Sequence, residues 1–200
     1  MSGFSSKRRM LLTVPAAVAL SSFLAGCGKK ELAFQGSDIT GTQLGRDLEM
    51  QDGTGQTRTL ADYKGKVALV FFGYTQCPDV CPTAMAELSQ TMELLGDDAS
   101  KVQVIMISVD PARDTPEILS AYVKAFNPAF VGLTGTPEQL GKTAKSFKAY
   151  YAKSSGGTAD QYGMDHASSF YILDQEGEAR VLVSGNASAQ DIAADIKQLL

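Results

Sequence analysis

Two predominantly apolar runs, residues 67–74 and 102–109, constrain the fold of this chain more than any other feature. Their β-branched and aromatic side chains are typical of strands buried on both faces of a sheet. Each run is followed by a stretch with helical signals, and 200 residues provide one substantial core rather than two. Strand, helix, strand and helix in this order predict an α/β domain.

Turn and capping signals predict the remaining elements. Asp52-Gly53-Thr54-Gly55 is a turn signal and predicts an N-terminal hairpin. Proline near the first helical position predicts three helices, and a fourth closes the chain: residues 82–95, 115–126, 136–150 and 188–200. A short strand and an antiparallel pair complete the pattern, at residues 131–134, 168–174 and 179–184. We therefore expect a thioredoxin-like mixed β-sheet flanked by helices, with a loop inserted at residues 152–162.

The N-terminal segment has the order of a secretory signal. The basic group Lys7-Arg8-Arg9 precedes 16 uncharged residues, fewer than the roughly 20 that span a bilayer comfortably. Leu-Ala-Gly-Cys at its end resembles the bacterial lipobox, which implies a lipoprotein signal peptide at residues 1–26 and acylation of Cys27. A plain cleavage site with an incidental cysteine is the alternative, and the arginine pair also resembles a twin-arginine export signal.

The lipobox resemblance sets the expected domain plan. Residues 27–45 are rich in small and polar residues and are expected to form a lipid-anchored tether, with the folded domain at residues 46–200. We expect this domain on the extracytoplasmic face of a bacterial membrane, where disulfides can persist.

Charge and composition limit the partners and the metal chemistry. Outside residues 1–26, the chain holds 15 Lys and Arg against 22 Asp and Glu, so nucleic acid is excluded as a partner. The chain has three cysteines and a single histidine. With Cys27 lipidated, the domain cannot build a four-ligand Cys/His zinc site without a carboxylate or a second chain.

Cys77 and Cys81 lie between the first buried strand and the first long helix. Pro78 and Pro82 disfavour helical backbone at the residues before them, which predicts a tight loop with both cysteines extended. With Pro82 as the first helical residue, Cys81 would be the N-cap, where free N–H groups favour thiolates. A structural disulfide is the alternative, but closing so short a loop removes little unfolded-state entropy.

His166 is the third candidate ligand. In a thioredoxin-like sheet, the loop that enters the penultimate hairpin lies beside the cysteine loop, so His166 is expected to reach both sulfurs. Two thiolates and an imidazole suit Cu(I), an added oxygen ligand would accept Cu(II), and zinc also binds these atoms. The neighbouring Asp165 either orients the imidazole or is a solvated carboxylate, and adjacency does not decide between them.

A series of motifs runs from about residue 40 onwards. In chain order they are Phe72-Gly73-Tyr74-Thr75, Cys77-Pro78-Asp79-Val80-Cys81-Pro82, Ser108-Val109-Asp110-Pro111 with Arg113-Asp114-Thr115, Val131-Gly132-Leu133-Thr134-Gly135, Tyr150-Tyr151 and Asp165-His166. With these motifs the chain resembles the Sco/SenC copper chaperones. The resemblance implies a thioredoxin-like fold and copper, as Cu(I) or Cu(II), on Cys77, Cys81 and His166. It also implies membrane anchoring and delivery to the dinuclear copper centre of cytochrome c oxidase. We expect a monomer whose partners are the copper-bearing oxidase subunit and a periplasmic copper donor.

A thiol–disulfide reductase is the competing function, with Cys77 and Cys81 as nucleophile and resolving thiol in either order. Thioredoxin-type enzymes place a proline before the penultimate strand, where this chain has Ser168, so we expect a binding protein rather than an enzyme. Outside the site, Arg113 is expected to pair with a neighbouring carboxylate and pin its loop. Met85 and Met92 have helical spacing and are expected in the core.

Overall fold

The computed structural model describes residues 32–155 and 162–200, of which Ala33–Leu200 belongs to one compact unit. Its strands are β1 (Ser37–Asp38), β2 (Glu49–Gln51), β3 (Thr57–Thr59), β4 (Val67–Gly73), β5 (Val102–Ser108), β6 (Val131–Leu133), β7 (Tyr151–Lys153), β8 (Met164–His166), β9 (Phe170–Leu173) and β10 (Ala179–Val183). Its helices are α1 (Val80–Leu95), α2 (Pro116–Phe126), α3 (Pro137–Phe147) and α4 (Ala189–Lys197), with short 3-10 helices at Leu60–Tyr63 and Gly96–Lys101.

The two apolar runs form the centre of a six-stranded sheet of order β1-β10-β9-β4-β5-β6. Strands β4 and β5 pair in parallel from Val67 opposite Val102 to Gly73 opposite Ser108. On its other edge β4 pairs antiparallel with β9, and every residue of β4 is buried. The expected mixed sheet is therefore confirmed, and burial of both faces explains why β4 has no polar alternation.

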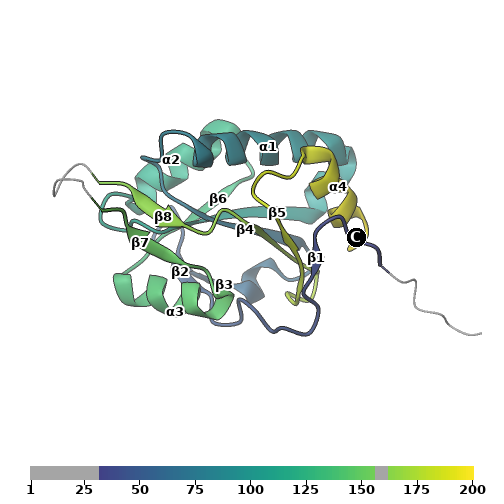
Figure 1. Ribbon diagram of the computed structural model, residues 1–200, viewed down its shortest axis with the longest axis horizontal. Coiled ribbons are helices and arrows are strands. Elements are labelled where there is room, and N and C mark those ends of the chain that lie inside the picture. The colour runs from purple at the N-terminus through teal and green to yellow at the C-terminus, as the bar shows by residue number, and fades with distance from the viewer. Residues whose placement is uncertain (1–31, 156–161) are drawn as a thin grey trace, which may run out of the picture. The chain divides into compact units, whose positions relative to one another are not determined.

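Helices cover both faces of this sheet (Figure 1). Helices α1, α2 and α4 lie on one face, while α3 lies on the other with the β2–β3 hairpin. Three helices begin where the sequence predicts, because the side chains of Thr115, Thr136 and Ser188 each accept a hydrogen bond from a first-turn N–H. Met85 and Met92 are buried in the core, as expected.

The segment before residue 46 differs from the expected tether. The backbone N–H groups of Gln35 and Gly36 donate to the buried Asp195 carboxylate of α4, at 2.6 and 2.9 Å. Strand β1 pairs with β10, and Leu44 is buried. The described part of residues 27–45, from Ala33 on, is thus a component of the folded unit, because its backbone donors are satisfied by α4 and the sheet edge. Cys27 lies outside the described residues.

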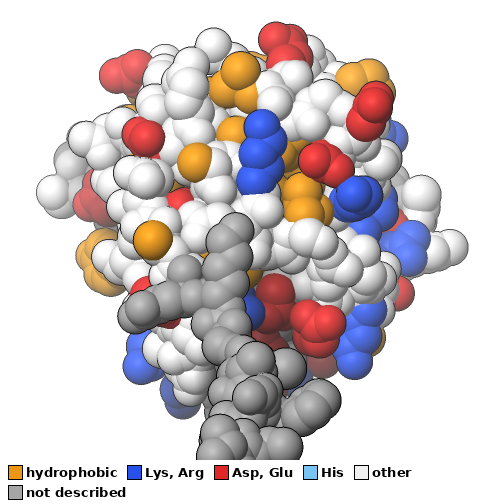
Figure 2. Space-filling view, turned by 90° about the vertical axis from the view of Figure 1, so that its right-hand side faces the viewer, with side chains coloured by type: hydrophobic (Ala, Val, Ile, Leu, Met, Phe, Trp, Pro, Cys, Tyr) orange, Lys and Arg blue, Asp and Glu red, His pale blue; other side chains and the backbone are white. Residues whose placement is uncertain are grey.

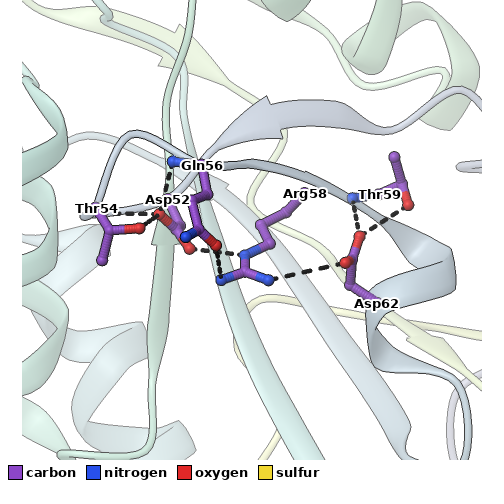
Figure 3. A network of polar contacts seen from close by, with 6 residues as sticks. All are labelled: Asp52, Thr54, Gln56, Arg58, Thr59 and Asp62. Carbon is purple, nitrogen blue, oxygen red and sulfur yellow. Dashed lines mark hydrogen bonds and ion pairs between the residues drawn. The ribbon is translucent and has the colours of Figure 1, made fainter.

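The predicted N-terminal hairpin is present as β2 and β3, and a polar network closes its turn (Figure 3). The Asp52 carboxylate accepts hydrogen bonds from the Thr54 hydroxyl at 2.6 Å and from Arg58 Nε at 2.7 Å. Burial raises the pKa of Asp52, but these bonds and the Thr54 and Gln56 amides outweigh burial and lower it to about 2.

The loop expected at residues 152–162 begins within a strand. Strand β7 pairs antiparallel with β8, with Tyr151 opposite His166, and this hairpin is separate from the six-stranded sheet. Residues 156–161 lie outside the described part.

The end of the molecule that carries the C terminus shows acidic and basic side chains interspersed (Figure 2). Among the described residues, none of the helices has the length and apolar character needed to cross a membrane.

Candidate metal centre

The cysteine loop leads directly into α1, but the helix begins earlier than expected. Asp79 occupies the N-cap position and Val80 is the first helical residue, so Cys81 lies inside the first turn. The prediction of an extended Cys81 at the N-cap is therefore wrong. Pro82 is tolerated at the third helical position because N–H groups of the first turn have no partner within the helix.

The sulfur of Cys77 lies against the start of α1. The Cys81 N–H donates to Cys77 Sγ at 3.4 Å, whereas the Asp79 side chain makes no capping hydrogen bond. Burial works to raise the pKa of Cys77, but the backbone N–H groups of Asp79, Val80 and Cys81 and the thiol of Cys81 lower it below its usual range. Cys77 is partly exposed. The helix N-terminus thus favours a thiolate at Cys77.

Cys81 has the opposite environment. Its side chain is fully buried, and burial raises the pKa of its thiol well above the usual range. The Cys77 sulfur also acts in this direction, and one hydrogen bond from the Tyr74 backbone only partly opposes it. Both cysteines are free thiols. The expectation that the helix start would favour thiolates at both positions therefore holds only for Cys77.

His166 is the last residue of β8, and its ring points at the cysteines. Its Nε2 lies 3.5 Å from Cys81 Sγ, and its Nδ1 lies 3.0 Å from the Ala167 carbonyl oxygen. Because a carbonyl only accepts, Nδ1 carries the proton in this contact, so in the neutral form of the ring the Nε2 lone pair faces the sulfur. The rings of Phe71 and Tyr74 make T-shaped contacts with the imidazole, with centroids 6.0 and 5.9 Å away.

Asp165 does not orient the imidazole. Its carboxylate accepts a hydrogen bond from the Ser154 hydroxyl at 2.7 Å, and the side chain is exposed. Asp165 and His166 are consecutive in a strand, so their side chains point to opposite faces. Of the two roles left open by the sequence, the structure supports the solvated carboxylate, and the Ala167 carbonyl orients the ring instead.

Cys77, Cys81 and His166 form one cluster. Their two Sγ atoms and the imidazole nitrogen lie within 4.8 Å of one another. The cluster opens into a cleft of about 400 Å³, whose lining includes Cys77, His166 and Met164. Two sulfurs and a neutral imidazole nitrogen at this spacing are a donor set for a soft metal ion.

Comparison with known proteins identifies the family. A family model described as SCO1/SenC matches residues 37–200. The chain belongs to the SCO1/SenC family. The protein sco1 of Schizosaccharomyces pombe is 34% identical over 201 residues, which cover 97% of this chain and 76% of that protein.

Solved structures of the family have the same fold. Copper-bound ScoI of Bradyrhizobium japonicum is 36% identical with a TM-score of 0.70, over 84% of this chain and 100% of that one. BsSco, described as having a disulfide switch and as a member of the Sco family of cytochrome c oxidase assembly proteins, is 25% identical. Its TM-score is 0.63, over 82% of this chain and 96% of that one. The thioredoxin-like arrangement expected from the sequence is thereby confirmed.

Sequence reasoning missed one group of residues around the SCO1/SenC site. The buried Asp114 carboxylate accepts hydrogen bonds from the hydroxyls of Thr75 and Ser108, both at 2.6 Å. Thr75 is two residues before Cys77, so Asp114 ties the cysteine loop to the end of β5. The expected ion pair in the loop after β5 is also present, and it joins Arg113 to Asp110. Asp114 directly follows Arg113 in the sequence, which is a signal for a further polar contact in this loop. Its partner Thr75, however, lies far away in the chain.

Proposed function

We propose that this protein binds copper through Cys77 Sγ, Cys81 Sγ and His166 Nε2 and passes the metal to another protein. The convergence of these three atoms within 4.8 Å is the observation that carries the proposal. The copper-bound relative from Bradyrhizobium japonicum, at 36% identity, supports the choice of metal.

The donor set favours monovalent copper. Two thiolates and one imidazole are soft ligands in the number that Cu(I) accepts, whereas Cu(II) would need an added oxygen ligand. Cys81 is buried with a raised pKa, so copper takes the place of a proton on this sulfur when it binds. Copper binding therefore releases a proton, and loss of the metal restores a neutral thiol in the core.

Cys77 is the ligand from which transfer begins. It is partly exposed and lines the cleft beside His166, whereas Cys81 is buried. An incoming thiolate or imidazole can therefore reach the metal from the side of Cys77. The acceptor is the copper-bearing subunit of cytochrome c oxidase, for which the description of BsSco as a member of a family of oxidase assembly proteins is the support.

We further propose that the protein acts as a monomer outside the bacterial cytoplasm, held to the membrane by a lipid on Cys27. The basic group before an uncharged run and the Leu-Ala-Gly-Cys sequence support this assignment. The acyl chain would place the cleft within reach of a membrane-bound oxidase and of a periplasmic copper donor.

Chelator competition tests the ligand assignment. His166→Ala is expected to lower Cu(I) affinity by about tenfold or more, because it removes one of three ligands. Ser168→Ala, which changes another side chain lining the same cleft, is the matched control and is expected to bind as the wild type does. X-ray absorption of the copper-loaded wild type should report two sulfur neighbours and one nitrogen neighbour of the copper ion. Wild-type affinity in His166→Ala would contradict the proposal.

A thiol–disulfide reductase is the second candidate, and the contrast between the cysteines favours it. Cys77 has a lowered pKa and partial exposure, as an attacking thiol requires, and Cys81 is buried beside it as a resolving thiol. Reduction of an acceptor disulfide would oxidise the pair to a Cys77–Cys81 disulfide and transfer two electrons. This activity should survive His166→Ala, whereas copper transfer should not.

A further inference from the structure

Arg113 contacts the two segments that supply the candidate ligands, although it belongs to neither. It lies in the loop between β5 and α2, where its Nε pairs with the Asp110 carboxylate. Its Nη1 donates to Gln76 Oε1 at 3.1 Å, and Gln76 directly precedes Cys77. The centre of its guanidinium lies 3.7 Å from the ring centroid of Tyr162, in the segment that leads into β8.

The contacts close into a ring of three side chains. The Tyr162 hydroxyl donates to Asp110 Oδ1 at 2.8 Å, while Arg113 binds the same carboxylate and covers the face of the tyrosine. The side chains of Asp110 and Arg113 are 3% and 15% exposed, so solvent screens this ion pair only weakly. Arg113 is therefore fixed in place by Asp110 and can position whatever else it touches.

The hairpin that carries His166 needs such an anchor. Strands β7 and β8 have three residues each and share no ladder with the six-stranded sheet. Two short strands alone are marginally stable at best. Tyr162 stands two residues before β8 and four before His166, so a contact that holds Tyr162 limits how far β8 can move from the cysteine loop.

We propose that Arg113 is a positioning residue, which holds the strand of His166 against the loop of Cys77 before any metal is bound. Through Tyr162 it fixes one side of the donor set, and through Gln76 it fixes the other. The benefit for copper rests on the proposed function, because preorganised ligands need no ordering when the ion arrives. The effect on the hairpin does not depend on copper.

Arg113→Lys tests this role, since lysine keeps the charge but cannot pair with Asp110, reach Gln76 and cover Tyr162 together. The matched control is Arg180→Lys, which alters a similar pair with Asp174 at 2.9 Å, with side chains 24% and 12% exposed. In the metal-free protein, amide hydrogen exchange is measured at Ser154 and Ala167, whose N–H groups donate to Gly163 and Tyr150. We expect exchange about tenfold faster in Arg113→Lys and unchanged in the control.

A second variant covers the case in which Arg113→Lys destabilises the whole fold. Tyr162→Leu keeps the buried ion pair but removes the aromatic face, and it should loosen the same two amides while core amides of β4 stay protected. Because His166 is the only histidine, each of its two ring nitrogens gives one NMR signal that needs no further assignment. These signals should shift in Arg113→Lys and Tyr162→Leu and not in Arg180→Lys.

Copper titration separates this inference from the proposed function. We expect both variants to bind Cu(I) about tenfold more weakly than the wild type. Unchanged exchange and unchanged histidine signals in both variants would overturn the positioning role. A loosened hairpin with wild-type Cu(I) affinity would overturn its benefit for copper, whereas a wild-type protein that binds no copper would overturn the proposed function and leave the hairpin result standing.

Discussion

The Cys81 sulfur lies 3.5 Å from Nε2 of His166, although 85 positions separate the two residues in the chain. The fold brings them together because β8 runs past the start of α1. The Ala167 carbonyl then selects the ring nitrogen that faces the sulfur. The candidate ligands therefore form one cluster, and its two sulfurs differ in exposure and in pKa. These differences lead to the expectations below.

The two cysteines should react at different rates with an alkylating agent in the reduced, metal-free protein. Cys77 has a lowered pKa and partial exposure, whereas burial raises the pKa of Cys81. Since the thiolate is the nucleophile, we expect Cys77 to be modified about tenfold faster or more at neutral pH. Its rate should rise with pH and level off below the pH expected for an unperturbed cysteine.

Peptide mapping by mass spectrometry measures both rates in one sample. In denaturant the two rates should converge, because burial and the helix N-terminus are then lost. Equal rates in the folded protein would show that the contrast between the thiols is wrong.

Gly73→Ala should disturb the site, because position 73 packs directly against the Cys81 sulfur. A Cβ atom at Gly73 would lie 2.7 Å from the Phe71 ring, closer than packed atoms allow, and 3.0 Å from Cys81 Sγ, which is a tight contact. We expect the free energy of unfolding to fall by about 1–3 kcal/mol, from overpacking of a buried position. Cu(I) affinity should fall as well, because the Cys81 sulfur must move.

Gly141→Ala is the control for this substitution. A Cβ atom there meets only the Tyr151 hydroxyl at 3.8 Å, and alanine favours the helix, so stability should be unchanged or higher. Thermal unfolding and chelator competition measure both effects. A Gly73→Ala protein with wild-type stability and affinity would contradict the packing argument.

Asp52→Asn should remove a contribution to stability that depends on pH. The folded-state pKa of Asp52, about 2, lies below the unfolded value of about 3.9. The ionised carboxylate therefore stabilises the folded protein, and this contribution is fully present at pH values above the unfolded pKa. The contribution, roughly 2 kcal/mol at neutral pH, is lost as the pH falls towards 2. We expect the variant to have a lower Tm at pH 7 and the difference to narrow between about pH 4 and pH 2.

The exposed pair of Asp98 and Lys101 provides the comparison. Asp98→Asn should leave the Tm nearly unchanged across this range, because solvent screens an exposed ion pair. A constant difference in Tm between Asp52→Asn and the wild type from pH 7 to pH 2 would rule out the network of Figure 3 as its source.

Cys27→Ser should abolish lipid attachment in a bacterial host, since the cysteine sulfur is the atom that receives the lipid at a lipobox. Incorporation of labelled palmitate measures lipid attachment directly. The variant should also be absent from the membrane fraction after cell fractionation. Cys77→Ser, which changes a cysteine of the domain, should keep the label. Label retained by Cys27→Ser would contradict the expected anchor.

Features set by local chemistry could be predicted from the sequence. The helix starts at Thr115, Thr136 and Ser188 follow from hydroxyls that cap their own first turns, within three residues. The central strands follow from apolar runs long enough for burial on both faces. The error at Cys81 had a local origin too, because proline disfavours helical backbone before it but is tolerated throughout a first turn.

The outcome for Asp165 and for residues 33–45 depended on contacts between distant segments. Adjacency to His166 gave no means of knowing that Ser154 would bind the Asp165 carboxylate. Polar composition likewise suggested a free tether, whereas the Asp195 carboxylate binds its backbone N–H groups from the other end of the chain.

Short-range preferences in the chain by themselves determined the order of strands and helices and the residue types available to a metal. Only the tertiary structure decided that Cys81 would be buried and Cys77 partly exposed, and that a backbone carbonyl and Arg113 would support the site. The physical reason is that burial, hydrogen bonding and charge pairing depend on which groups lie nearby in space, and at this site the groups come from β4, α1, the loop after β5 and β8.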